Sequence, residues 1–182
     1  MQSLPTSPLH FLAIAPLHFR RPDVFDITAL FYSSMAVDLE MVFSLLLGGS
    51  LTHGVWHSYF SVLTIYPVAV GLFVYAVERL FKGTILGVYR FFRFYPEKVR
   101  YPFRTIYLCC LIGGVSHVFF DMCTHEVSSY VLFPLVTENP FWIGDWSYVV
   151  FVLMFLLSFY TVFLWIKQML VHRRMRKGNV DG

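Results

Sequence analysis

Histidine and acidic residues lie inside stretches of this sequence that are otherwise apolar. His117, Asp121 and His125 follow one another at intervals of four positions, and this spacing places side chains on one face of a helix. His53 and His57 share the same spacing. Imidazole and carboxylate groups gathered in this way are ligands that zinc and similar divalent metals use. The spacing therefore predicts a metal site with ligands from more than one helix.

Two further carboxylates, Asp38 and Glu40, lie in the first long apolar stretch. Because they are two positions apart, they point to different faces of a helix. We expect one to be a metal ligand and the other to orient a ligand or to act as general base. In such a site the metal lowers the pKa of a water to about 7. Either Glu40 or Asp38 would accept the proton.

The composition indicates that these groups lie in a membrane. Hydrophobic residues make up 57% of the 182 residues and charged residues 14%, whereas soluble domains are about 45–50% apolar and about 25% charged. Ionisable side chains inside a membrane are costly, and they mark functional sites by default. The chain is therefore expected to be a multi-pass protein of the cell membrane, with membrane lipids as partners.

We predict an all-α fold, a polytopic helical bundle that forms one integral membrane domain over residues 1–182. Gly113 and Gly114 should allow two helices to approach closely. Residues 1–19, interrupted by prolines, suit a re-entrant or interfacial segment, and residues 81–102, basic and aromatic, suit a helix in the membrane surface. The predicted transmembrane helices are 27–48, 58–80, 103–125 and 147–169, followed by a cytoplasmic tail at 170–182.

The distribution of lysine and arginine predicts the topology. Residues 81–102 and the C-terminal tail are basic, whereas the 126–145 loop has neither lysine nor arginine, so the first two are expected in the cytoplasm. At about 1.5 Å per residue, Asp38 and Asp121 lie roughly 20 and 25 Å from the cytoplasmic starts of their helices. Both depths fall in the outer half of a hydrocarbon core about 30 Å thick. The predicted ligands therefore share one level.

The order of these motifs, SPLHFLAIAPL, SSMAVDLE, THGVWHS and GGVSHVFFDMCTH, resembles a known family. It is similar to the membrane-bound metal-dependent hydrolases, small polytopic inner-membrane proteins that include LexA-regulated members. The resemblance covers roughly residues 7–125, and Val37 stands where the family has a proline. It implies a metal-dependent hydrolase, and it adds His10 to the ligands. The residues that match are His10, Asp38, Glu40, His53, His57, His117, Asp121 and His125.

Two functions remain open at this stage. The first is hydrolysis of a lipid-type ester or phosphoester near the outer leaflet, with zinc as the favoured metal. The second is non-enzymatic: a proton or metal transporter, or a subunit of a membrane complex, that uses the His/Asp cluster structurally or as a relay. Its partner would be a second copy of the chain, in a homo-oligomer, or another protein of a membrane complex. Serine-hydrolase, zincin and P-loop motifs are absent from the sequence. The basic clusters are typical of cytoplasmic loops, so no nucleic-acid partner is expected. His18 and His172, beside basic residues, are expected at the surface.

Overall fold

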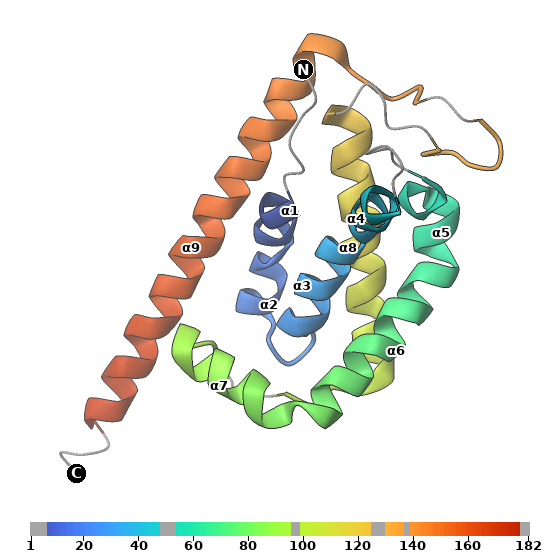
Figure 1. Ribbon diagram of the computed structural model, residues 1–182. Coiled ribbons are helices and arrows are strands. Elements are labelled where there is room, and N and C mark those ends of the chain that lie inside the picture. The colour runs from blue at the N-terminus through green and yellow to red at the C-terminus, as the bar shows by residue number, and fades with distance from the viewer. Residues whose placement is uncertain (1–6, 48–53, 96–98, 125–129, 137–138, 179–182) are drawn as a thin grey trace.

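The computed structural model describes residues 7–47, 54–95, 99–124, 130–136 and 139–178. Within these ranges all regular elements are helices, which confirms the all-α prediction (Figure 1). The helices are α1 (Ser7–Ile14), α2 (Pro16–Arg20), α3 (Ile27–Ala36), α4 (Leu39–Leu46), α5 (Tyr59–Leu63), α6 (Ile65–Leu80), α7 (Lys82–Phe92), α8 (Phe103–Thr124) and α9 (Ser147–Gly178), and two short 3₁₀ turns are η1 (Val55–His57) and η2 (Gly144–Trp146).

Helix α8 is the element around which the bundle packs. It contacts α3, α5 and α6, and the buried side chains of Leu30, Tyr66 and Ile106 belong to the core between them. The long helix α9 runs along one side of the molecule, where α1 and α2 lie between it and α3 (Figure 1). The N-terminal helices thus join α9 to the rest of the bundle.

Gly113 and Gly114 allow the close approach that the sequence predicts. A Cβ at Gly113 would lie 1.8 Å from Ser33 Oγ, and a Cβ at Gly114 would lie 2.7 Å from the Tyr66 ring. Ser33 Oγ donates to the Cys109 carbonyl at 3.3 Å, and the Tyr66 hydroxyl donates to the Ser33 carbonyl. Helices α3, α6 and α8 therefore meet at a point where α8 has no side chains.

Two helices, rather than the predicted four, are long and apolar enough to cross a membrane in the part of the chain that the structure describes. They are α8 and the segment Gly144–Arg173, which contains most of α9. The predicted span 27–48 is divided at Val37 and Asp38 into α3 and α4. The predicted span 58–80 is divided at Thr64, whose φ and ψ are −118° and −84°. These two predictions of continuous transmembrane helices were therefore wrong.

The position of Pro67 explains why the second break lies at Thr64. Proline lacks a backbone N–H, so it is tolerated in the first turn of a helix, where that group has no intrahelical acceptor. Pro67 occupies the first turn of α6, which begins at Ile65. Pro67 therefore lies in the first turn of a new helix and not inside a continuous one.

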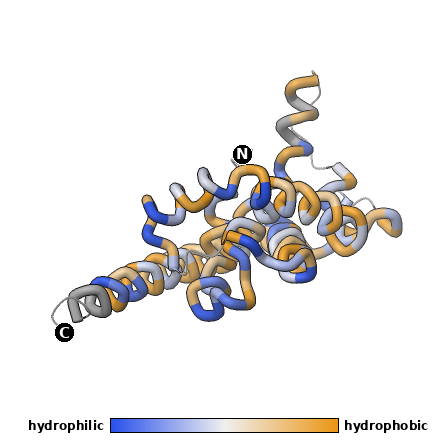
Figure 2. Tube along the Cα trace, turned by 90° about the horizontal axis from the view of Figure 1, so that it is seen from below, coloured by the Kyte–Doolittle hydropathy of each residue, from blue (hydrophilic) through white to orange (hydrophobic). Residues whose placement is uncertain are grey.

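Helix α9 exposes mainly apolar side chains. Leu156, Phe159 and Phe163 are all exposed, and little of the apolar segment is buried inside the protein. Hydrophobic residues predominate along the tube in Figure 2, and hydrophilic stretches lie near the C-terminal end of α9. The helix also continues past the predicted end at 169 to Gly178, so the predicted polar tail begins as helix.

His18 is buried, contrary to the surface position that the sequence predicts. Helix α2 turns its ring inward, and His18 Nδ1 lies 2.7 Å from the Phe25 carbonyl oxygen, the geometry of a donated hydrogen bond. The neighbouring Arg20 remains exposed and donates to the Tyr160 hydroxyl of α9 at 2.6 Å. A basic neighbour in the sequence is therefore a poor guide to exposure on so short a helix.

The α3–α8 contact predicts a large effect of Gly113→Ala. The new methyl group must displace Ser33, which is overpacking of a kind that costs about 1–3 kcal/mol, so the thermal unfolding midpoint in detergent should fall. Gly87→Ala is the matched control, because a Cβ on this residue of α7 would meet no atom within 4 Å. It should leave the midpoint unchanged or raise it. Unfolding of Gly113→Ala at the wild-type temperature would contradict the contact.

Candidate metal centre

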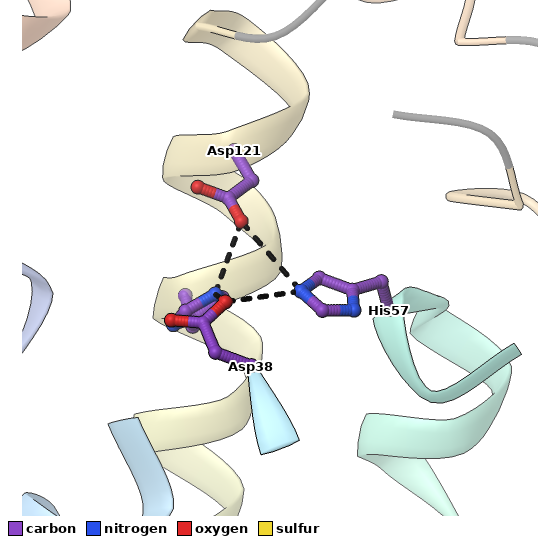
Figure 3. A group of neighbouring side chains, drawn as sticks. Asp38, His57 and Asp121 are labelled. Carbon is purple, nitrogen blue, oxygen red and sulfur yellow. Dashed lines mark hydrogen bonds and ion pairs between the residues drawn. The ribbon is translucent and has the colours of Figure 1, made fainter. Parts of the chain in front are cut away.

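Four side chains from three segments direct one ligand atom each towards a common point (Figure 3). They are Asp38, His57, His117 and Asp121, and their ligand atoms all lie within 4.8 Å of one another. His117 Nε2 is 3.0 Å from Asp121 Oδ2 and 3.2 Å from Asp38 Oδ1. His57 Nε2 is 3.4 Å from Asp38 Oδ1 and 3.9 Å from Asp121 Oδ2. His117 and Asp121 share a face of α8, as their spacing predicts. Asp38, from the break between α3 and α4, and His57, from η1, complete the group.

The donor set and its spacing fit a divalent metal. Zinc bonds of about 2.0–2.1 Å to nitrogen and oxygen place tetrahedral ligands about 3.3 Å apart, and the distances above scatter around this value. Two imidazole nitrogens and two carboxylate oxygens suit zinc, and they also suit iron or manganese. The side chains of His57, His117 and Asp121 are almost entirely buried. Such a set requires positive charge, which either a metal ion or protons on the imidazoles would supply.

The end of α3 orients His117. Its Nδ1 donates to the Ser34 carbonyl at 2.7 Å, which leaves Nε2 directed at the two aspartates. In a continuous helix the Asp38 N–H would bond this carbonyl, but here it bonds the Met35 carbonyl at 3.2 Å. The last carbonyls of a helix lack intrahelical partners. The helix break therefore leaves the Ser34 carbonyl free to accept from His117 and to fix the orientation of its ring. Metal-ligating histidines are commonly oriented in this way, by a hydrogen bond from the second ring nitrogen.

Glu40 secures the segment that carries His57. Its Oε2 accepts hydrogen bonds from the backbone N–H groups of Gly54 and Trp56, both at 3.1 Å, and lies 3.6 Å from His57 Nδ1. A Cβ at Gly54 would be 2.2 Å from Glu40 Oε1, so this close approach requires glycine. Burial opposes ionisation of Glu40, but His57 and the two N–H donors outweigh it and hold the pKa of the carboxyl below its usual value.

His10, on α1, contacts the centre from the opposite side. Its Nε2 lies 3.2 Å from Asp121 Oδ1, the oxygen that is not directed at the ligand atoms, and its ring stacks on His117 with centroids 4.2 Å apart. His10 is not part of the four-atom group. The structure therefore places it where it orients Asp121. The other two predicted ligands, His53 and His125, lie outside the described residues.

A second buried acidic pair was not predicted from the sequence. Asp26, the N-cap of α3, accepts from the Thr28 N–H at 2.9 Å, and Glu78 of α6 accepts from the Tyr101 N–H at 3.3 Å. The two carboxyl groups hydrogen-bond each other, so one of them carries a proton. Glu78 lies within the predicted span 58–80, and no role was predicted for it. Its position at the end of an apolar stretch was the signal that could have revealed it.

Fold and site together define an all-helical protein with a His/Asp cluster that could hold a metal ion. The chain belongs to the DUF4184 family, a domain of unknown function, whose model matches residues 4–179. No match was found among curated proteins or among solved structures.

The position of His10 predicts a graded effect on metal affinity. His10→Ala should weaken binding by about 10–100-fold, the usual effect of losing a group that orients a ligand, whereas His117→Ala should abolish it. His10→Gln should restore part of the affinity, because its amide can still donate to Asp121. Competition with a chromophoric chelator measures all three variants.

His18→Ala is the control for this series. It removes another buried histidine of the N-terminal helices, one that bonds the Phe25 carbonyl, and it should leave the metal affinity unchanged. If His10→Ala loses the metal as completely as His117→Ala, then His10 is itself a ligand.

Proposed function

We propose that this protein is a membrane-embedded, metal-dependent hydrolase that acts on a lipid-type ester or phosphoester. The observation that carries the proposal is the convergence of four ligand atoms from α8, η1 and the α3–α4 break, with the His117 ring oriented by the Ser34 carbonyl. Zinc is the first expectation, because imidazole nitrogens and carboxylate oxygens converge here at the spacing that zinc ligands have. The resemblance to membrane-bound metal-dependent hydrolases points the same way.

The residues divide into ligands and a proton acceptor. His57, His117 and Asp121 would hold the ion and leave one coordination position open for water. The bound metal would polarise the scissile group and make a water molecule acidic enough to attack. Asp38, whose Oδ1 is directed at the same point as His57 and His117, is the group placed to take a proton from that water. Glu40 would orient His57 through Nδ1.

Exposure around the cluster supports access from one side. The side chains of Asp38 and Glu40 are 15% and 30% exposed, whereas those of His57 and Asp121 are 1% and 4% exposed. Both exposed carboxylates lie at the start of α4. A substrate would therefore approach along this helix.

The surface of α4 favours an amphiphilic substrate. Its side chains at Leu39, Phe43 and Leu46 are exposed and apolar, on the same short helix that carries Glu40. A lipid could rest its acyl chain there with its polar linkage at the cluster. The positive-inside rule supports a cytoplasmic position for residues 81–102 and the C-terminus, with the centre towards the outer leaflet.

A second candidate function is transport of protons or metal ions, or a structural role in a membrane complex. The buried pair of Asp26 and Glu78 favours it, because this pair and the metal cluster lie at opposite ends of α3. Buried acidic groups along one helix are characteristic of proton relays in membranes. Metal binding without hydrolysis would favour this candidate.

The proposal predicts that Asp38→Asn separates metal binding from catalysis. This variant keeps His57, His117 and Asp121, so its metal content after purification should stay close to that of the wild type. Hydrolysis of a panel of lipid esters and phosphoesters should fall about 10²–10⁴-fold, the usual contribution of general-base catalysis. Metal analysis by mass spectrometry and release of product from lipid are the two measurements.

His117→Ala and Asp121→Ala complete the test. Both variants should lose metal and activity together, and removal of the metal from the wild type by a chelator should abolish activity reversibly. The exposed Asp23→Asn serves as the control for loss of a carboxylate. Equal metal content in the wild type and both ligand variants would show that the site is wrong.

A further inference from the structure

Helix α7 is held on the bundle by one face only. Tyr89 is buried on that face, and its hydroxyl lies 2.8 Å from Thr28 Oγ1 of α3. Around it, Tyr89 packs with Ile27 and Val99, and Ile85 and Leu86 of α7 pack against this cluster. The opposite face of α7 is exposed along its whole length.

The exposed face of α7 is divided lengthwise into two unlike sides. At about 100° per residue, Arg90 lies on one side of the buried face, whereas Lys82 lies within about 20° of Tyr89 and is exposed at the first residue of the helix. Arg93 follows at the cap of the helix. Val88, Phe91 and Phe92 lie on the other side, within an arc of about 100°. All six side chains are exposed. A helix with one basic side and one apolar side is suited to the interface between water and lipid.

The two sides are separated by a strip without side chains. Gly83 and Gly87 occupy the positions between them, and a Cβ at either residue would meet no atom within 4 Å. The helix backbone is therefore accessible to a molecule that contacts the basic and apolar sides at the same time.

Contacts with α9 place α7 at the level of the membrane surface. Trp165 Nε1 donates to the Phe92 carbonyl at 2.7 Å, and the Gln168 amide donates to the Tyr95 carbonyl. The Tyr95 ring stacks on His172 with centroids 3.9 Å apart. Figure 1 shows α7 beside the C-terminal half of α9.

The charge pattern of α9 shows where its apolar part ends. From Ser147 to Ile166 the helix has no charged residue, and Lys167 is the first. Twenty residues at about 1.5 Å each span about 30 Å, the thickness of the hydrocarbon core. Residues 165–172 therefore lie where α9 leaves the hydrocarbon, and α7 is attached to them.

We propose that α7 is a binding surface for anionic phospholipids, with Lys82, Arg90 and Arg93 at the head-group phosphates and Phe91 and its apolar neighbours among the acyl chains. Charge complementarity selects an anionic head group, since three exposed cations lie on this helix and its cap. The exposed phenylalanines select a lipid over a soluble anion, because they would otherwise face water. This surface lies away from the metal centre and does not depend on it.

Native mass spectrometry of the full-length protein tests the proposal. The delipidated protein is mixed in detergent with equal amounts of phosphatidylcholine and phosphatidylglycerol, and the retained lipids are identified. The wild type should retain phosphatidylglycerol in preference, and the double variant Lys82→Gln/Arg90→Gln should lose this preference. Phe91→Ser should reduce retention of phosphatidylglycerol while all the cations remain. Soluble glycerol phosphate in excess should not displace the lipid.

A second double variant, Arg21→Gln/Arg104→Gln, distinguishes an effect of the α7 surface from an effect of the protein's net charge. It also removes two exposed arginines, but neither lies on α7. This variant should keep the wild-type preference. Three results would overturn the proposal: equal retention of the two lipids by the wild type, equal loss of preference in both double variants, or displacement of the lipid by glycerol phosphate.

Discussion

The hydrogen bond from His117 to the Ser34 carbonyl is the constraint on which the rest of the site depends. It can form only if α3 ends before Asp38, so that the carbonyl is not taken by the helix itself. It also needs α3 and α8 in close contact, which Gly113 allows by presenting no side chain to Ser33. The end of α3 and the packing of α3 against α8 thus both determine the orientation of the His117 imidazole. The carboxylates that face it are brought into range by the same two conditions.

The interruption of the helix between α3 and α4 also decides the roles of the two acidic residues that follow. In one continuous helix, Asp38 and Glu40 would point to different faces. Here Asp38 turns towards His117, while Glu40 reaches the backbone of Gly54 and Trp56 and approaches His57 from behind. One carboxylate faces the ligand atoms and the other braces a ligand. The two histidines are therefore supported in the same manner, His117 by a carbonyl and His57 by a carboxylate.

Much of the site could be predicted from the sequence, because its signals were local. The spacing of His117 and Asp121 places both on one helical face whatever the position of the helix in the fold. Ionisable groups in apolar segments are costly, so several of them together indicate a common functional site. Pro67 indicates the interruption near Thr64, but the break at Asp38 could not be predicted, since it depends on partners elsewhere in the fold. The same holds for the burial of His18 and for the pairing of Asp26 with Glu78. Hydropathy predicts apolar length, but it does not show where a helix is interrupted to bring a polar group to its partner.

The position of α1 has a consequence for how the molecule is assembled. Helix α1 packs against α9, where Thr161 donates to the Leu12 carbonyl, and it also brings His10 to Asp121. During translation α1 leaves the ribosome long before α9, yet its binding surface is complete only when both α8 and α9 are in place. Contacts between segments so distant in sequence form late, because closing a long loop costs entropy. Among the described helices, α1 is thus made first and is among the last to settle, and it completes the surroundings of Asp121 only once α9 is in place.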